Sequence, residues 1–92
     1  MLYFYVYILK CSDGSYYIGH TDNMEQRLGQ YNAGFCTGYV AKRLPVELVF
    51  VETCGSRAEA IDAERQWKKW TRKKKEALIT GGWEAVKQVG KK

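Results

Sequence analysis

The stretch YVYILKCSDGSYYIG, residues 5–19, decides the fold of this chain. Residues 3–10 are mostly aromatic or β-branched, as is typical of a strand, and residues 12–14, SDG, are turn formers. Strand character returns at residues 16–20. The stretch therefore predicts a β-hairpin that carries tyrosines on both arms.

The length of the turn decides whether Tyr7 and Tyr17 share a face of the sheet. A two-residue loop would place Tyr7 opposite His20 and the two tyrosines on opposite faces, because side chains alternate along a strand. A three-residue loop, ending with Gly14 in the left-handed conformation, would place both tyrosines on one face. Gly19 would then lie opposite Tyr7 and leave open space beside its ring. The sequence permits both turns, and a shared site requires the second.

A helix, a loop and a third strand are predicted after the hairpin. Asp22 is a good N-cap, and Glu25 three residues later completes a capping box. Gly34 suits the C-terminus of this helix. Residues 35–45 show little periodicity and predict a loop, whereas residues 46–54 predict a strand.

Two further helices follow. Ser56 and Glu59 form a second capping box, and another short helix begins near Thr71 and closes at residues 81–82, both glycine. Residues 83–92 form a tail that docks or frays. The side chains available for docking are Trp83, Val86 and Val89. The order β-β-α-β-α-α predicts an α/β (α+β) domain over residues 1–82, built on a small sheet.

Length and charge restrict the classes of function. The chain has 92 residues, which favours one domain, and 15 Lys and Arg against 10 Asp and Glu give a formal charge of +5. Nucleic acid is the commonest acidic partner of a small basic domain, although a solvated basic face gives the same count. No apolar run has the length needed to span a bilayer, and the N-terminus lacks a signal-peptide pattern.

The cysteines predict no covalent partner. Cys11, Cys36 and Cys54 are an odd number at wide spacing, and they match neither a zinc site nor a disulfide framework. We expect three reduced thiols in a cytoplasmic protein.

Three side chains outside the hairpin are candidates for a site. Arg27 and Tyr31 are four positions apart, so they lie together on the first helix, near Gly19. Glu64 falls inside an apolar arc of the later helix. That arc is formed by Ala60, Ile61, Ala63 and Trp67. A carboxylate there is costly unless it pairs with an arginine, binds a metal or serves as a catalytic acid.

Together these residues resemble the GIY-YIG nuclease family. YVY at residues 5–7 and YIG at residues 17–19 match its two name motifs, followed by Arg27 and Glu64 in order. The small single-domain bacterial members are the most similar, and residues 3–80 are covered. The other stretches that match them are YNAG, RLPVELVF, RAEAIDAE and TRKKKEALI.

The resemblance implies a three-stranded antiparallel sheet flanked by helices, and an endonuclease that hydrolyses DNA phosphodiesters with one divalent metal, Mg²⁺ or Mn²⁺. It implies that Tyr7 activates the attacking water and that Tyr17 supports it. Arg27 would hold the scissile phosphate, and Glu64 would bind the metal. Two further residues are candidates for catalytic roles. Tyr31 lies where several members have a histidine or tyrosine near the same phosphate, and His20 follows the glycine of the second motif, where other members often carry lysine.

The role of Tyr7 has two alternatives. A free phenol has a pKa of about 10, so a base at neutral pH needs a pKa lowered by roughly 3 units. Alternatively, Tyr7 only positions the water. In either case Tyr7 and Tyr17 should share a face, with Arg27 and Glu64 directed toward the same cleft.

Departures from the family pattern keep other functions open. Tyr5 replaces the first glycine of the motif, and no asparagine follows Glu64, where many members have one. A non-catalytic nucleic-acid-binding module on the same fold, or a protein-interaction domain, is therefore an alternative. The basic run either contacts DNA phosphates or forms a solvated face. It consists of Lys68, Lys69, Arg72, Lys73, Lys74 and Lys75.

Overall fold

A three-stranded antiparallel sheet with the strand order β2-β1-β3 organises the chain. The computed structural model describes residues 3–35 and 38–89. The elements are β1 (Phe4–Lys10), β2 (Tyr16–Thr21), α1 (Met24–Asn32), a 3₁₀ turn (Ala41–Arg43), β3 (Glu47–Cys54), α2 (Arg57–Lys68) and α3 (Arg72–Val89). This confirms the expected sheet and the α+β class.

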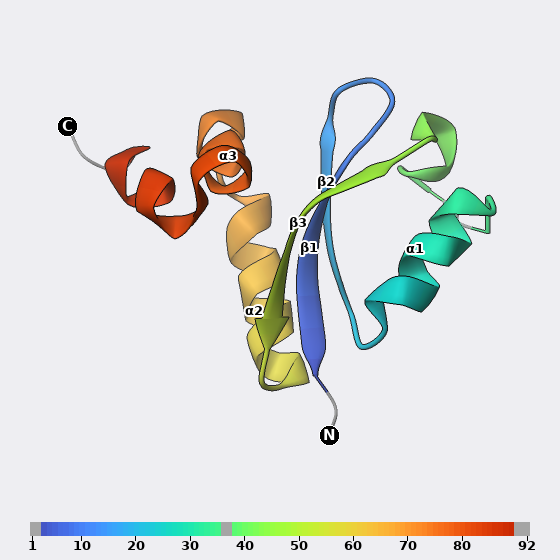
Figure 1. The fold of residues 1–92 in the computed structure, drawn as a ribbon, viewed down its shortest axis with the longest axis horizontal. Helices are drawn as coiled ribbons and strands as arrows, with labels where there is room; N and C mark the ends of the chain where they lie inside the picture. The colour runs from blue at the N-terminus through green and yellow to red at the C-terminus, as the bar shows by residue number, and fades with distance from the viewer. Residues whose placement is uncertain (1–2, 36–37, 90–92) are drawn as a thin grey trace.

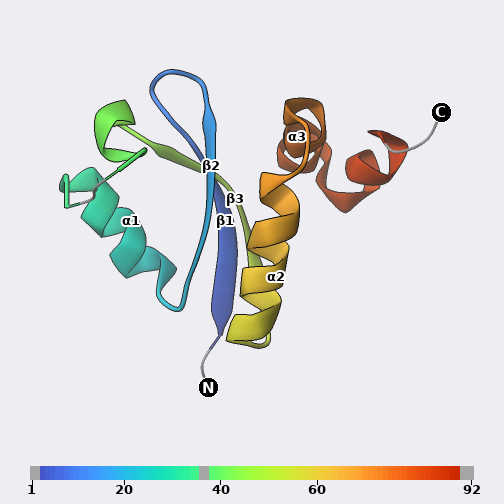
Figure 2. The same ribbon diagram turned by 180° about the vertical axis from the view of Figure 1, so that it is seen from behind.

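The helices lie on both sides of the sheet. Figures 1 and 2 show α2 and α3 on one side and α1 on the other, with β1 in the middle of the sheet. Consequently β2 and β3 are both edge strands. Within the described ranges, no helix combines the length and apolarity that a membrane crossing requires.

The register of the hairpin corresponds to the three-residue loop. Tyr7 pairs with Gly19, and Leu9 pairs with Tyr17. Gly14 has φ of 86°, the left-handed conformation that this loop requires of its last residue. Tyr7 and Tyr17 therefore lie on the same face of the sheet, as one of the two turns predicted.

The alternation of β1 separates two apolar clusters. On the side of α2 and α3, Val6 and Ile8 pack around Trp67, which is 1% exposed. On the side of α1, Tyr7 and Leu9 pack with other buried side chains. Full burial of such side chains contributes about 1.5–3 kcal/mol each to the stability of the fold. The central strand is therefore held from both faces.

The N-cap of α1 is Asn23, and the prediction of Asp22 is wrong by one residue. The Asn23 side chain accepts a hydrogen bond from the Gln26 N–H at 3.0 Å. Strand β2 continues through Thr21, whose hydroxyl accepts the Asn23 N–H at 3.1 Å. This contact turns the chain one residue later than predicted, and Asn is as good an N-cap as Asp.

The second predicted cap is present. The Ser56 hydroxyl accepts the Glu59 N–H at 3.2 Å, and the Glu59 carboxylate accepts the Gly55 N–H at 3.0 Å. Gly34, with φ of 82°, follows the C-cap of α1 as expected. The predicted loop contains the 3₁₀ turn and the buried side chain of Val40.

The C-terminal segment docks on the core. Gly82, with φ of 68°, ends the first part of α3, and the chain resumes as a helix through Val89. Val86 is buried, and the Trp83 indole donates a hydrogen bond to Glu52 at 2.6 Å. Residues 83–89 are therefore packed, whereas residues 90–92 lie outside the described part of the chain.

Cys11 and Cys54 are free and buried. Cys36 lies outside the described residues.

Candidate functional site

One pocket at the outer edge of β2 collects most of the candidate residues. Its cavity volume is about 320 Å³. The lining residues are Tyr7, Tyr17, Gly19, His20, Thr21, Asp22, Arg27, Arg57 and Glu64. They include five of the six side chains with a predicted catalytic role, and the sixth, Tyr31, contacts Tyr7 directly. The expected convergence on one cleft is present.

The two faces of the sheet both contribute to this pocket. Tyr7 and Tyr17 come from the face of the sheet that α1 covers, and helix α1 itself carries Arg27. His20 and Glu64 come from the opposite face, where α2 packs. They can meet because β2 is an edge strand, so side chains from both faces reach around it.

Gly19 holds a position that any side chain would obstruct. A Cβ atom there would lie 2.5 Å from the Tyr7 hydroxyl oxygen and 2.8 Å from the ring carbon that bears it. The space predicted beside the Tyr7 ring is therefore not open, because the ring itself lies over Gly19. Glycine at this position lets the Tyr7 ring lie flat against β2 and form the floor of the pocket.

The Tyr7 phenol is neutral in this environment. Its oxygen lies 2.9 Å from that of Tyr31, and the Tyr7 side chain is 0% exposed. Burial, and then the hydrogen bond to Tyr31, raise the pKa of Tyr7 far above its ordinary value. The charge of Arg27 acts in the opposite direction and does not compensate.

Arg27 is half-buried beside these phenols. Burial alone would lower the pKa of its guanidinium, but hydrogen bonding to Tyr31 and the influence of Tyr7 raise it overall. Arg27 therefore stays charged. Its planar donors suit a phosphate at the mouth of the pocket.

Glu64 contacts two side chains, the imidazole of His20 and the ammonium of Lys68. One carboxylate oxygen lies 2.7 Å from His20 Nδ1, and the other accepts a hydrogen bond from Lys68 Nζ at 2.8 Å. Burial would raise the pKa of Glu64, but Lys68 and His20 outweigh it and lower the pKa. Glu64 is thus an ionised carboxylate. Its partners are not the arginine that one alternative predicted, because Lys68 lies one helical turn away on the same face.

The donor set at Glu64 fits a hard divalent cation that brings its own remaining ligands. Within residues 3–35 and 38–89 there is no cluster of three or more His, Cys, Asp or Glu side chains around one point. Mg²⁺ commonly binds one or two carboxylates together with substrate phosphate oxygens and waters. A carboxylate offers about four lone-pair sites, so Glu64 retains capacity beside its two partners.

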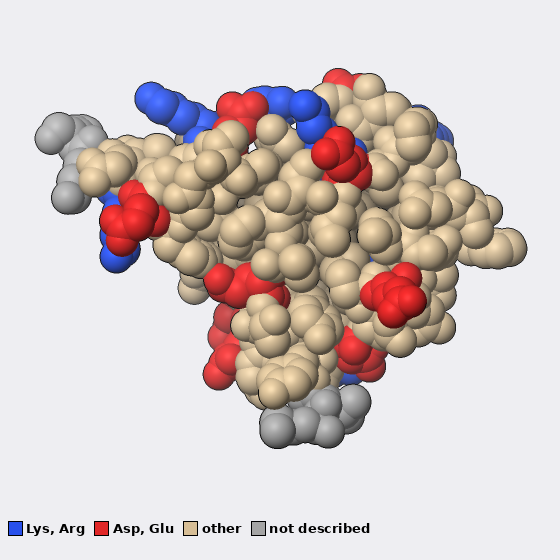
Figure 3. All heavy atoms as spheres, in the orientation of Figure 1, with Lys and Arg blue, Asp and Glu red and all other residues tan. Residues whose placement is uncertain are grey.

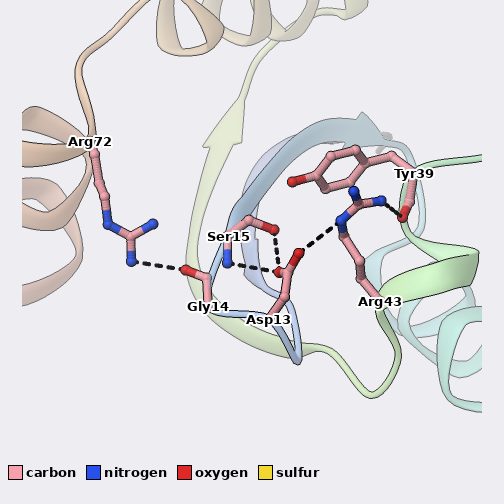
Figure 4. Close-up of polar contacts among 6 residues, drawn as sticks. All are labelled: Asp13, Gly14, Ser15, Tyr39, Arg43 and Arg72. Carbon is pink, nitrogen blue, oxygen red and sulfur yellow. Dashed lines mark hydrogen bonds and ion pairs between the residues drawn. The ribbon is translucent and has the colours of Figure 1, made fainter.

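The basic run does not present one row of free charges. Arg72 donates to the Gly14 carbonyl at 2.8 Å (Figure 4), lies 3.3 Å from Glu76 and covers the Tyr16 ring. The Lys74 ammonium lies over the Trp70 ring at 4.5 Å. These contacts attach α3 to the hairpin and to the connection between α2 and α3.

The other lysines of the run differ in their surroundings. Lys69 and Lys73 are exposed, Lys75 is half-buried, and Lys68 contacts Glu64. Figure 3 shows the face of the molecule that is seen in Figure 1. Several basic side chains gather along the upper edge of this face, where Figure 1 draws α3. Phosphate binding by the whole run remains a prediction.

Three lining residues had no predicted role in the site, namely Thr21, Asp22 and Arg57, and the last two form an ion pair. The Arg57 guanidinium lies 3.8 Å from the Asp22 carboxylate, and both side chains border the pocket. They come from the ends of α2 and β2, which are far apart in the sequence. No local pattern indicates this pair, because only the packing of α2 against the sheet brings it together.

The chain is similar to known proteins over most of its length. A family model described as the GIY-YIG catalytic domain matches residues 3–77. A UPF0213 protein of Bacillus pumilus is 44% identical over 75 residues, which are 82% of this chain and 76% of the relative. One of Haloquadratum walsbyi is 42% identical over 80 residues, covering 87% and 90%.

Two solved structures are also similar. The solution NMR structure of a UPF0213 protein from Bacillus halodurans is 33% identical, with a TM-score of 0.56 and coverage of 98% of this chain and 99% of that one. The solution NMR structure of an E. faecalis protein is 43% identical, with a TM-score of 0.59 and coverage of 84% and 82%.

Proposed function

The chain belongs to the GIY-YIG family, and on that premise we propose that it is an endonuclease that hydrolyses phosphodiester bonds in DNA with a divalent metal. The observation that carries this proposal is the convergence of Tyr7, Arg27 and Glu64 on one pocket from three different elements. Hydrolysis needs an oriented water, stabilisation of charge on the phosphate and help for the leaving oxygen.

Arg27 binds the scissile phosphate in this proposal. Its guanidinium is charged, half-buried and directed toward the pocket. A fork of donors in a partly desolvated site stabilises the charge that develops on phosphate oxygens better than the same group in water. The largest effect of Arg27 is therefore on the rate of cleavage.

Tyr7 orients the attacking water as a neutral phenol. Its raised pKa opposes the alternative in which a phenolate removes a proton. The phenol is fully covered in the structure, so the proposal requires substrate binding to open its contact with Tyr31. Tyr17, which is half-buried at the mouth of the pocket, supports the same water or phosphate.

Glu64 holds the metal, with its carboxylate oriented by His20. A divalent cation, Mg²⁺ or Mn²⁺, supplies Lewis-acid stabilisation of the phosphate when it is bound. His20 fixes one oxygen of Glu64 through the contact of 2.7 Å. Lys68 on the other oxygen keeps the carboxylate ionised.

A screen of DNA structures tests the proposal. Single-stranded, duplex, flap and branched DNA are incubated with Mg²⁺ or Mn²⁺, and the wild type is compared with Arg27→Ala. Arg27→Ala should abolish cleavage and leave much of the DNA affinity, because the arginine acts mainly on the transition state. Arg65→Ala, an exposed arginine on α2 that does not line the pocket, is the matched control. Absence of cleavage of every DNA by the wild type would contradict the proposal.

The second candidate is a non-catalytic nucleic-acid-binding module. The observation that favours it is that both oxygens of Glu64 already have partners within the chain, His20 Nδ1 and Lys68 Nζ. Binding of DNA without cleavage in either metal would support this candidate.

A further inference from the structure

A second groove adjoins the candidate site on the outer side of β2. It has a cavity volume of about 290 Å³. The residues that line it are Tyr16, Tyr17, Ile18, Tyr39, Lys68 and Lys75. Three of the six are tyrosines and two are lysines, and within the described part of the chain the lining contains no carboxylate. The groove thus combines aromatic surface with positive charge.

Two residues connect this groove to the candidate site. Tyr17 lines both cavities. Lys68 lines the groove and also donates to Glu64 at 2.8 Å. A ligand in the groove therefore lies directly beside whatever occupies the pocket.

The rings of Tyr17 and Tyr39 form one aromatic wall. Their centroids are 6.2 Å apart and their planes are inclined by only 21°. The stacked pair gives the groove an extended aromatic wall, against which a further planar ring can pack in an offset-stacked or edge-to-face arrangement. Tyr39 remains 43% exposed, so this wall is accessible.

Tyr39 is held in place by the hairpin turn. The Arg43 guanidinium lies 3.7 Å from the centre of the Tyr39 ring and donates to the Tyr39 carbonyl at 2.9 Å (Figure 4). Arg43 in turn donates to the Asp13 carboxylate at 2.9 Å. An exposed aromatic ring fixed in this way loses little conformational freedom when a ligand stacks on it.

We propose that this groove binds an unpaired nucleobase of the DNA strand whose phosphate lies in the adjoining pocket. A nucleotide combines a planar aromatic base with an anionic phosphate, and the groove offers an aromatic wall and two ammonium groups. Bases stack on aromatic side chains without regard to sequence, whereas a base within a duplex is already stacked. The inference rests on the proposed function and deepens it, because it makes DNA with unpaired nucleotides the substrate class.

Binding of two matched strands tests this groove. One probe is a labelled oligothymidine of about a dozen nucleotides, and the other has the same phosphates but abasic tetrahydrofuran sugars. Fluorescence anisotropy with EDTA present measures affinity without cleavage. The wild type should bind the strand with bases about 5-fold or more tightly than the abasic strand.

Four proteins separate stacking from other effects. Tyr39→Ala should lose most of the preference for bases and bind the abasic strand as the wild type does, whereas Tyr39→Phe should retain the preference. Tyr3→Ala is the matched control, because Tyr3 is equally exposed, at 44%, and does not line the groove. Thermal melts should show that all variants fold.

Two outcomes overturn the inference. Equal binding of both strands by the wild type, or an equal effect of Tyr39→Ala on both, would exclude base stacking at this wall. The proposed function can fail separately. If the wild type prefers the strand with bases but cleaves no DNA in Mg²⁺ or Mn²⁺, the nuclease proposal is wrong and base binding in the groove is retained. If the wild type cleaves DNA but binds both strands equally, the nuclease proposal is retained and base binding in the groove is wrong.

Discussion

The phenol oxygens of Tyr7 and Tyr31 lie 2.9 Å apart, so one hydroxyl donates to the other on the floor of the pocket. Strand β1 supplies the first phenol and helix α1 the second. This contact connects the sheet to the helix that carries Arg27. It also keeps Tyr7 in its neutral form.

Tyr7 should make the fold sensitive to alkali. The pKa of Tyr7 is raised in the folded chain, first by burial and then by Tyr31, whereas the unfolded phenol ionises near pH 10. Above that pH the unfolded chain has released a proton that the folded chain retains. The contribution of Tyr7 to stability is thus present below about pH 10 and decreases as the pH rises further, by up to ~1.4 kcal/mol per pH unit.

Tyr7→Phe should remove this extra alkaline loss, which urea denaturation between about pH 9 and pH 11 can measure. Tyr3→Phe, at an exposed tyrosine, serves as the control. A stability curve of Tyr7→Phe that falls as steeply as that of the wild type would contradict a neutral, buried Tyr7.

Gly19→Ala should disturb both the fold and the site. The new methyl group would meet the Tyr7 hydroxyl at 2.5 Å, so the ring must move out of its place against β2. Overpacking of this kind costs about 1–3 kcal/mol of stability. The rate of cleavage should fall even at temperatures where the variant is fully folded, because Tyr7 would leave its position relative to Arg27.

The control for this change is Gly29→Ala on α1. A methyl group there meets no atom within 4 Å, and alanine is the better helix former by about 1 kcal/mol. Gly29→Ala should therefore be neutral or stabilising. Equal effects of the two substitutions on thermal stability would rule out a special role of the glycine opposite Tyr7.

Glu64→Gln should abolish cleavage and weaken metal binding while the fold survives. A neutral amide is a poor ligand for a hard cation. The pairs with His20 and Lys68 are partly exposed, so their loss should cost about 1 kcal/mol of stability without metal. Single-turnover cleavage and thermal melts with and without Mg²⁺ give the three readouts. A variant that binds Mn²⁺ as tightly as the wild type would show that Glu64 is not a ligand.

Lys68→Met should strengthen metal binding. Its ammonium competes with a cation for one oxygen of Glu64. Release of a partly exposed pair, worth about 0.5–1 kcal/mol, corresponds to a ~2- to 5-fold tighter Kd for Mn²⁺ by calorimetry. Lys69→Met, at the exposed neighbour, should leave the Kd unchanged. A weaker Kd for Lys68→Met would mean that the lysine supports the cation site and does not compete with it.

The parts of the fold that depend on neighbouring residues were predictable. The hairpin itself follows from local residues, but the sequence permitted both turn lengths, and the register shows that the three-residue loop is formed. The spacing of Arg27 and Tyr31 places them together on one helix. The ion pair of Glu64 with Lys68 is also local, because the two are four positions apart, although the basic run that contains Lys68 predicted either phosphate contact or a solvated face.

The remaining features depend on contacts between distant elements. The shift of the α1 cap to Asn23 follows from the Thr21 hydroxyl at the end of β2, which no capping pattern indicates. The pairing of His20 with Glu64 requires α2 to pack over β2 on the face that carries His20. Arg72 contacts the hairpin turn for the same reason, since α3 must first be placed beside it.

The packing of the tryptophans has a spectroscopic consequence. The chain contains three tryptophans, and the rings of Trp67, Trp70 and Trp83 lie within 6 Å of one another. Intrinsic tryptophan emission therefore reports the layer formed by α2 and α3, while the tyrosine-rich layer around α1 contributes nothing to it. Emission excited at the red edge can follow the layer of α2 and α3 during denaturation, while circular dichroism in the far ultraviolet follows the backbone of the whole chain. Coincident transitions would mean that both layers unfold as one cooperative unit.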